Sequence, residues 1–232
     1  MPHDRDPAPG PASGPASGPA SGPGDADLAG RFAALLDDAP GAAGLGADLL
    51  RRWSGPERHY HTTGHLRAVL GHLGRELRGH AADPAAVALA AWFHDAVYDP
   101  AAGGTANEER SAELAERTLP GTGAPPALTA EVARLVRLTA GHDPATGDTN
   151  GEALCDADLA VLGHPPEEYA AYTAAVRREY GFVPPEAFRT GRAEVLRGLL
   201  AHPRLYRTPY AARHWEPTAR YNLAAELDLL TR

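Results

Sequence analysis

The sequence predicts an all-α protein with a single helical domain. Apolar residues recur every three or four positions through most of the chain after residue 26, which is the period of an amphipathic helix. No window shows the two-residue alternation of β-branched residues that a half-buried strand would have. The 232 residues, 43% of them hydrophobic, suffice to bury one generous core.

Residues 1–25 are expected to form a disordered tail ahead of a folded domain that spans residues 26–232. The tail contains PASGPASGPASGP, a repeat without any large apolar side chain. Such a segment buries too little apolar surface to offset the entropy that ordering would cost.

The helical pattern divides the domain into successive segments. Two short helices are expected at 28–36 and 45–53, followed by a longer one at about 57–77. Asp83-Pro84 then marks a helix start, because Asp can cap the first turn and Pro suits its first position. The following stretch, AAVALAAWFHDAVY, is apolar nearly all round and predicts the central buried helix. Later helices are expected at 107–119, 127–140, 152–162, 166–180, 185–201 and 214–230, the first of them capped by Asn107.

The composition argues against several classes of function. A net charge of −8 disfavours binding to the phosphate backbone of nucleic acid, and no apolar run is long enough to cross a membrane. All 22 basic residues are arginine, which excludes lysine Schiff-base chemistry. The single cysteine, Cys155, cannot form an internal disulfide and fits a reducing compartment. Because the N-terminus also lacks the layout of a signal peptide, we expect a cytoplasmic protein.

The stretch RHYHTTGHL holds three histidines within seven residues. His61 and His65 are four residues apart and are expected on one face of a helix, with their side-chain roots about 5–6 Å apart. One of them could then bind a metal while the other faces whatever the metal holds. His59 should face elsewhere and is expected at the surface.

Two further stretches place ionisable residues in apolar surroundings. AAWFHDAVYD carries His94 and Asp95 inside the predicted central helix, and LCDADLAVLG carries Asp156 and Asp158. Burying several carboxylates without partners is costly, and one divalent cation would remove that cost for all of them. Mixed imidazole and carboxylate ligands suit Mn, Fe, Co, Ni, Zn or Mg. Taken singly, each residue also fits a simpler role as a hydrogen-bonded core histidine or a helix cap.

The order His … His-Asp … Asp resembles that of the HD superfamily of metal-dependent phosphohydrolases, and more narrowly a bacterial subgroup of predicted HD phosphohydrolases. The stretches that carry the resemblance are ERHYHTTGHL, AAWFHDAVYD, NEERSAELA, LTAGHDP, DADLAVLG, YTAAVRREYGFV, GRAEVL and ARYNLAAEL. They span about residues 51–230. The resemblance implies a helical bundle of the HD-domain type. It also implies a divalent metal ion bound by His65, His94, Asp95 and Asp158, with Asp156 a weaker match than Asp158 for the last ligand.

YHTTGHL is also similar to the YHN-x-x-H segment of cyclic-nucleotide phosphodiesterases in the same superfamily. The similarity implies that His61 is the general acid and His65 a metal ligand, although Thr62 replaces the Asn of that pattern. Asp95, next to both ion and water, could then orient the nucleophile or bridge to a second ion. Arg58 is the candidate for a phosphate contact, with a solvated helix-face arginine as the equal alternative.

Two residues stay open as additional ligands. His142 follows a predicted helix and could bind a second metal or the substrate, or be an ordinary loop histidine. Glu108 lies near a predicted helix start, where an acidic side chain favourably complements the helix dipole. Its place in a family-like NEE-x-SA string keeps a role in the site open, as the less favoured alternative to the helix-start role.

The resemblance implies hydrolysis of a phosphate ester or of a nucleotide-like small molecule, with no nucleic-acid or membrane partner. Two alternatives remain. One is a di-iron oxygenase on the same scaffold, which His142 keeps open, and the other is a nucleotide-binding module without catalysis. The sequence leaves the substrate, the identity and number of metal ions, and the oligomeric state undetermined.

Overall fold

The structure, a computed structural model, describes residues 23–232 and contains only helices, turns and loops over that range. The prediction of an all-α fold is confirmed. The elements in chain order are α1 Pro23–Ala34, α2 Ala42–Trp53, α3 Thr63–Gly74, α4 Pro84–Phe93, α5 Ala106–Thr118, η1 Leu119–Thr122, α6 Pro126–Leu138, α7 Thr149–Asp158, η2 Leu159–Gly163, α8 Pro166–Glu179, α9 Pro185–Ala201, α10 Pro209–His214 and α11 Glu216–Thr231. Of the tail expected at 1–25, residues 1–22 lie outside the described range and residues 23–25 belong to α1.

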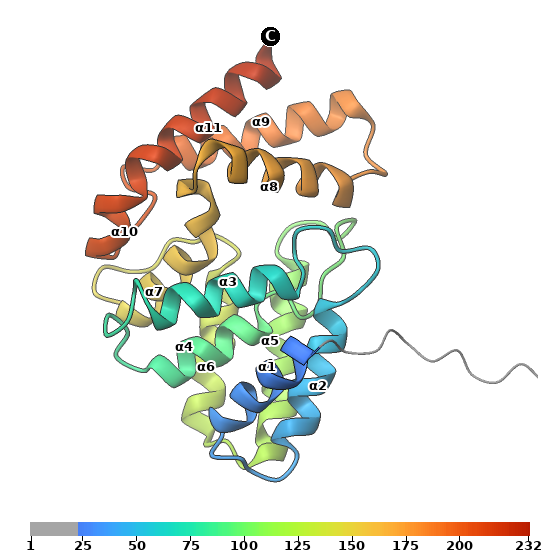
Figure 1. Ribbon diagram of the computed structural model, residues 1–232, viewed down its shortest axis with the longest axis vertical. Helices are drawn as coiled ribbons and strands as arrows, with labels where there is room; N and C mark the ends of the chain where they lie inside the picture. Colours follow the sequence, from blue (N-terminus) through green and yellow to red (C-terminus); the bar gives the residue numbers. More distant parts are fainter. Residues whose placement is uncertain (1–22) are drawn as a thin grey trace, which may run out of the picture.

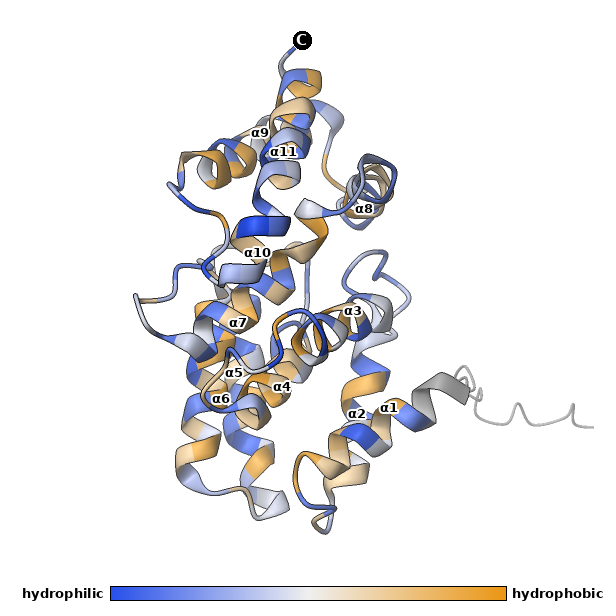
Figure 2. Ribbon diagram, turned by 60° about the vertical axis from the view of Figure 1, so that its left-hand side comes forward, coloured by the Kyte–Doolittle hydropathy of each residue, from blue (hydrophilic) through white to orange (hydrophobic). Residues whose placement is uncertain are grey.

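Helix α4 forms the centre of the helical body. Seven of its ten residues are buried, and it contacts α3, α5, α6 and α7; its ribbon is largely apolar in Figure 2. Trp92 packs edge-to-face on Phe32 of α1, with ring centroids 5.0 Å apart. The carbonyl of Trp92 accepts a hydrogen bond of 2.9 Å from the indole nitrogen of Trp53 in α2. The apolar composition of the central segment thus corresponds to full burial.

The C-terminal helices form a second layer. In Figure 1, α8, α9 and α11 lie at one end of the molecule, and α7 with η2 leads to them from the body formed by α1 to α6. Helix α11 packs on α9 and on η2. The side-chain amide of Asn222 in α11 donates to the carbonyls of Leu162 and His164, at 2.9 Å each. These bonds fix the second layer to the chain directly after α7.

The central helix begins where the sequence predicts but ends earlier. The Asp83 carboxylate accepts a hydrogen bond of 3.0 Å from the Ala86 amide, and Pro84 occupies the first turn. The helix ends at Phe93, so the prediction that His94 and Asp95 lie inside it is wrong. The carbonyl of Asp95 accepts a hydrogen bond from an arginine side chain, which helps hold the chain in a turn.

Helix α3 begins at Thr63, six residues later than predicted. The hydroxyl of Thr62 caps it by accepting a hydrogen bond of 3.2 Å from the Gly64 amide. His61 therefore lies in the loop before the helix, and the prediction that it shares a helix face with His65 is wrong. The ring centroids of these two histidines nevertheless lie only 5.9 Å apart, because the loop folds back beside the helix.

Other predicted helices differ mainly at their ends. The predicted helix 152–162 is α7 followed by η2, and the predicted helix 214–230 is α11, which begins two residues later than predicted. Thr105, not Asn107, precedes α5. The Asn107 side chain instead pairs with the backbone amide and carbonyl of Asp99, at 3.0 Å each, and so fixes the loop that follows α4.

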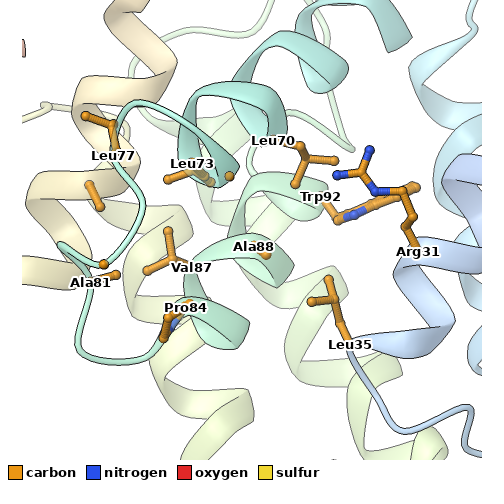
Figure 3. A pocket seen from close by; sticks show the side chains of 13 residues that line it. Arg31, Leu35, Leu70, Leu73, Leu77, Ala81, Pro84, Val87, Ala88 and Trp92 are labelled. Carbon is orange, nitrogen blue, oxygen red and sulfur yellow. The ribbon is translucent and has the colours of Figure 1, made fainter.

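An apolar cavity of about 200 Å³ lies between α1, α3 and α4. Figure 3 shows Leu70, Val87 and Trp92 on its walls, with Arg31 at one side. It has no lining residue in common with the cavity over the histidine and aspartate residues described below. None of the described helices combines the length and apolar character needed to cross a membrane.

Replacing Asp83 with Ala is expected to lower the free energy of unfolding by about 1 kcal/mol, because the first turn of α4 loses its cap. Asp83→Asn should recover most of this loss, since its amide oxygen can accept the same hydrogen bond. Urea unfolding of the three proteins measures the difference. Equal stability of the Ala variant and wild type would contradict a capping role.

Candidate metal centre

Four side chains from three separate segments converge on one point. His65 lies in the first turn of α3, and Asp158 ends α7. The other two, His94 and Asp95, follow the end of α4. His65 Nε2 lies 3.3 Å from His94 Nε2 and 2.9 Å from Asp158 Oδ1. His94 Nε2 lies 3.2 Å from Asp95 Oδ2 and 3.4 Å from Asp158 Oδ1.

The spacing of these donor atoms fits a shared metal ion. With bonds of about 2.0–2.2 Å to nitrogen and oxygen, two ligand atoms of one ion lie about 3.0 Å apart at 90° and about 3.4 Å apart at the tetrahedral angle. The observed separations of 2.9–3.4 Å fall in this range. Donor atoms of His65, His94 and Asp95 all lie within 4.8 Å of one another. Two imidazoles and two carboxylates match the ligand preferences of divalent transition metals.

A backbone contact orients the ring of His94. Its Nδ1 lies 2.9 Å from the carbonyl oxygen of Ala91. Because a carbonyl can only accept, Nδ1 carries a proton. When the ring is neutral, it therefore presents the lone pair of Nε2 to the other donor atoms. Metal-binding histidines commonly have this kind of second contact, which fixes the tautomer and the ring orientation.

The electrostatics of the cluster favour positive charge. Burial alone would lower the pKa of His94, but the carboxylates of Asp95 and Asp158 raise it well above its ordinary value. Burial raises the pKa of Asp158, but the charge of His94 and hydrogen bonds from two other histidines hold it well below its usual range. A divalent cation would therefore compete with protons for these side chains.

His142 contacts the second oxygen of Asp158. Its Nε2 lies 2.7 Å from Asp158 Oδ2, whereas Oδ1 faces His65 and His94. His142 has a left-handed backbone, with φ of 48°, which is uncommon for a residue with a side chain and is often found at functional sites. The structure thus gives this loop histidine a place beside the cluster.

A cavity of about 320 Å³ opens over the cluster. Glu108 also lines it, and its Oε2 is buried without a hydrogen-bond partner in the described part of the chain. The group of donor atoms within 4.8 Å of one another contains neither Glu108 nor Asp158, but Asp158 Oδ1 lies within 3.4 Å of both His65 Nε2 and His94 Nε2. The cavity is large enough to admit a small molecule.

Glu179, which no sequence pattern singled out, organises the loop before α3. Its Oε1 accepts hydrogen bonds from the backbone amides of His59, Tyr60 and His61, at 2.7, 2.8 and 2.9 Å. Its Oε2 lies 2.7 Å from His61 Nδ1, so the ring donates there. The other ring nitrogen, Nε2, faces Asp95 at 3.9 Å. The signal available in the sequence was an acidic residue near the C-terminal end of the predicted helix 166–180, where the helix dipole disfavours negative charge.

The pairing with Glu179 changes the titration of both partners. Burial raises the pKa of Glu179, but the hydrogen bond and charge of His61, together with the backbone amides, lower it to about 2. Burial lowers the pKa of His61, but Asp95 and Glu179 outweigh this effect and raise it. The Tyr98 hydroxyl also donates to Glu179 at 3.2 Å, and its ring lies 4.3 Å from that of His61. His61 is thus held in one orientation with its protonated form favoured.

Arg58 is buried and neither contacts the cavity nor lies on a solvated helix face, so both sequence interpretations need correction. Its guanidinium donates to the carbonyls of His61 and Asp95 at 2.8 Å each. It also lies 5.3 Å from the ring centroids of Trp53 and Tyr98. Arg58 therefore joins the loop before α3 to the turn after α4.

Asp156 also has a structural role in place of the metal contact considered for it. The residue is fully buried, and its carboxylate accepts hydrogen bonds from the backbone amides of Arg207 and Thr208 at 2.7–3.0 Å. It belongs to the anchoring of the loop before α10. His59 is exposed, as expected.

No known protein family, curated protein or solved structure matches this chain.

Replacing Glu179 with Ala is expected to lower the free energy of unfolding at pH 7 by about 3 kcal/mol or more, because three backbone amides lose their acceptor. Glu179→Gln should lose less, since its amide oxygen can still accept from those amides. Glu167→Ala, an exposed position on the same helix, should stay within about 0.5 kcal/mol of wild type.

Urea unfolding gives the three values. If the Ala and Gln variants were equally unstable, acceptance of the backbone hydrogen bonds would not be the cause. The advantage of wild type over Glu179→Gln should also shrink as pH falls below about 4.5, because a carboxyl with a depressed pKa loses its stabilising effect on protonation.

Proposed function

We propose that this protein is a metal-dependent phosphohydrolase of the HD superfamily type, acting on a phosphate ester of a small molecule in the cytoplasm. The convergence of His65, His94, Asp95 and Asp158 is the observation that carries the proposal. Its support is the match between their donor-atom separations and the geometry of a shared ion.

These four residues would hold the ion, which could be Mn, Mg, Fe, Co, Ni or Zn. A bound divalent ion supplies Lewis acidity that makes a water molecule a better nucleophile near neutral pH and offsets the charge of the phosphate. Asp95 Oδ2 faces both His94 and His61, so its carboxylate is the group proposed to orient the attacking water.

His61 is the proposed general acid. As the bond between phosphorus and the leaving oxygen breaks, the proton on Nε2 passes to that oxygen, and the product leaves as an alcohol. Glu179 supports this role because it fixes the ring through Nδ1 and favours the protonated form. Tyr98 and Arg58 act as positioning residues, the first through Glu179 and the second through the carbonyl of His61.

A di-iron oxygenase is the second candidate, and the contact between His142 and Asp158 is what favours it. The two oxygens of Asp158 face different histidines, as a carboxylate that bridges two ions would require. The same contact also suits a hydrolase with two ions. A nucleotide-binding module without catalysis would not need the buried acidic and imidazole groups, and no observation favours it.

We expect the purified protein to bind about one to two equivalents of a divalent transition metal per chain. His94→Ala combined with Asp95→Ala should abolish this binding because two of the four ligands are lost, whereas His214→Ala, an exposed histidine, should not change it. Elemental analysis, together with equilibrium titration with Mn²⁺ to detect weak binding, measures the difference. Equal binding by all three proteins would contradict the site, and close to two equivalents of iron would favour the oxygenase.

His61→Gln is expected to lower kcat for an alkyl phosphate by about 10²- to 10⁴-fold, with the metal content unchanged. The loss should be much smaller for p-nitrophenyl phosphate, since its leaving oxygen departs without needing a proton. Exposed His59→Gln serves as the control and should match wild type. Equal losses for both substrates would argue against a general-acid role.

A further inference from the structure

A third cavity, also largely apolar, adjoins the one over the cluster. It measures about 500 Å³ and lies between α8 and α9. Its apolar and aromatic walls are Tyr172, Val176, Tyr180, Val183, Phe188 and Val195. His61, Tyr172, Tyr180, Arg192 and Val195 line both cavities. The apolar space therefore begins at His61, on the side to which a leaving group would depart.

The two cavities offer little positive charge from arginine. Arg192 is the single arginine among their lining residues, and Glu226 already binds it, with Arg192 Nε 2.8 Å from Oε1 and Nη2 3.0 Å from Oε2. The remaining Nη1 donates to the Tyr172 hydroxyl at 3.2 Å. This guanidinium is therefore committed to protein partners.

Acidic groups line the cavity over the cluster, whereas none lines the cavity between α8 and α9. Asp95, Glu108 and Asp158 all line the cavity over the cluster. An ion bound there could offset the charge of one phosphoryl group. Within these two cavities, a second phosphoryl group would meet carboxylates and apolar walls without an available arginine. The linings of these two cavities thus disfavour di- and triphosphates.

The geometry points to a substrate that carries one phosphoryl group on an uncharged alcohol with an aromatic or branched apolar body. This inference rests on the proposed phosphohydrolase function. Water adds to phosphorus as the ester P–O bond breaks, and the leaving oxygen takes its proton from His61, which gives the free alcohol and inorganic phosphate. The apolar body occupies the space between α8 and α9, and burial of that body supplies the selectivity.

Gly191 of α9 allows this space to be filled with little disturbance. Gly191 lines the cavity between α8 and α9, and a Cβ added there meets no atom within 4 Å. Gly198 on the same helix is equally open, is also exposed, and lines neither cavity. Gly191→Leu and Gly198→Leu are therefore a matched pair, since both should raise helix propensity and only the first narrows the cavity.

The test compares 2-phenylethyl phosphate with glycerol 1-phosphate and with adenosine 5′-diphosphate, using the full chain with Mn²⁺. Wild type should have a kcat/KM for the phenylethyl ester about tenfold or more above that for the glycerol ester, with the diphosphate poorer still. Gly191→Leu should remove this preference, whereas Gly198→Leu should retain it. Equal use of the two monoesters, preference for the diphosphate, or insensitivity to Gly191→Leu would overturn the inference while leaving the hydrolase intact.

A binding measurement separates this inference from the proposed function. Calorimetric titration with 3-phenylpropylphosphonate, which cannot be hydrolysed at the replaced oxygen, should give affinity about tenfold weaker for Gly191→Leu than for wild type and Gly198→Leu. That result without hydrolysis of any ester would support the ligand class and contradict the hydrolase. Equal binding by the three proteins, or binding by none, would overturn the ligand class.

Discussion

The position of the loop before α3, and with it the position of His61 beside the cluster, depends on hydrogen bonds to the carboxylate of Glu179. Glu179 lies at the end of α8, yet its partners are three consecutive backbone amides in the loop before α3 and the ring of His61. Those amides lie outside regular helix, so without this acceptor they would need water or another polar group. One buried side chain thus joins the second layer of helices to the body and determines where His61 points.

Charge compensation explains why so many ionisable groups can be buried together. Asp95 and Asp158 face imidazoles, Glu179 faces amides and an imidazole, and Arg58 faces carbonyls. Each group therefore has partners of opposite charge or polarity, as low-dielectric surroundings require. The partners differ in kind, however. Contacts to backbone fix geometry, whereas under the proposed function the facing imidazoles and carboxylates would exchange a proton for a cation.

The helical fold and the residues that meet at the cluster could both be predicted, because each leaves a pattern in the order of apolar and charged residues. Helical periodicity repeats along the chain, and a charged residue such as Asp158 is conspicuous in an apolar segment. The end of α4 at Phe93 could not be read in the same way, because the apolar pattern continues past it. The role of Arg58 could not be predicted either, since its partners are backbone carbonyls, which leave no trace in residue identity.

The separation of 120 residues between His59 and Glu179 has a consequence for the order of folding. Closing so long a loop is entropically costly, and chains emerge from the ribosome with the N-terminal end first. His65, His94, Asp95 and Asp158 all precede α8 in the chain, so the candidate ligands can come together before α8 has docked. The environment of His61 is then completed only when α8 docks, so under the proposed function the ligands of the ion would be in place before the general acid is oriented.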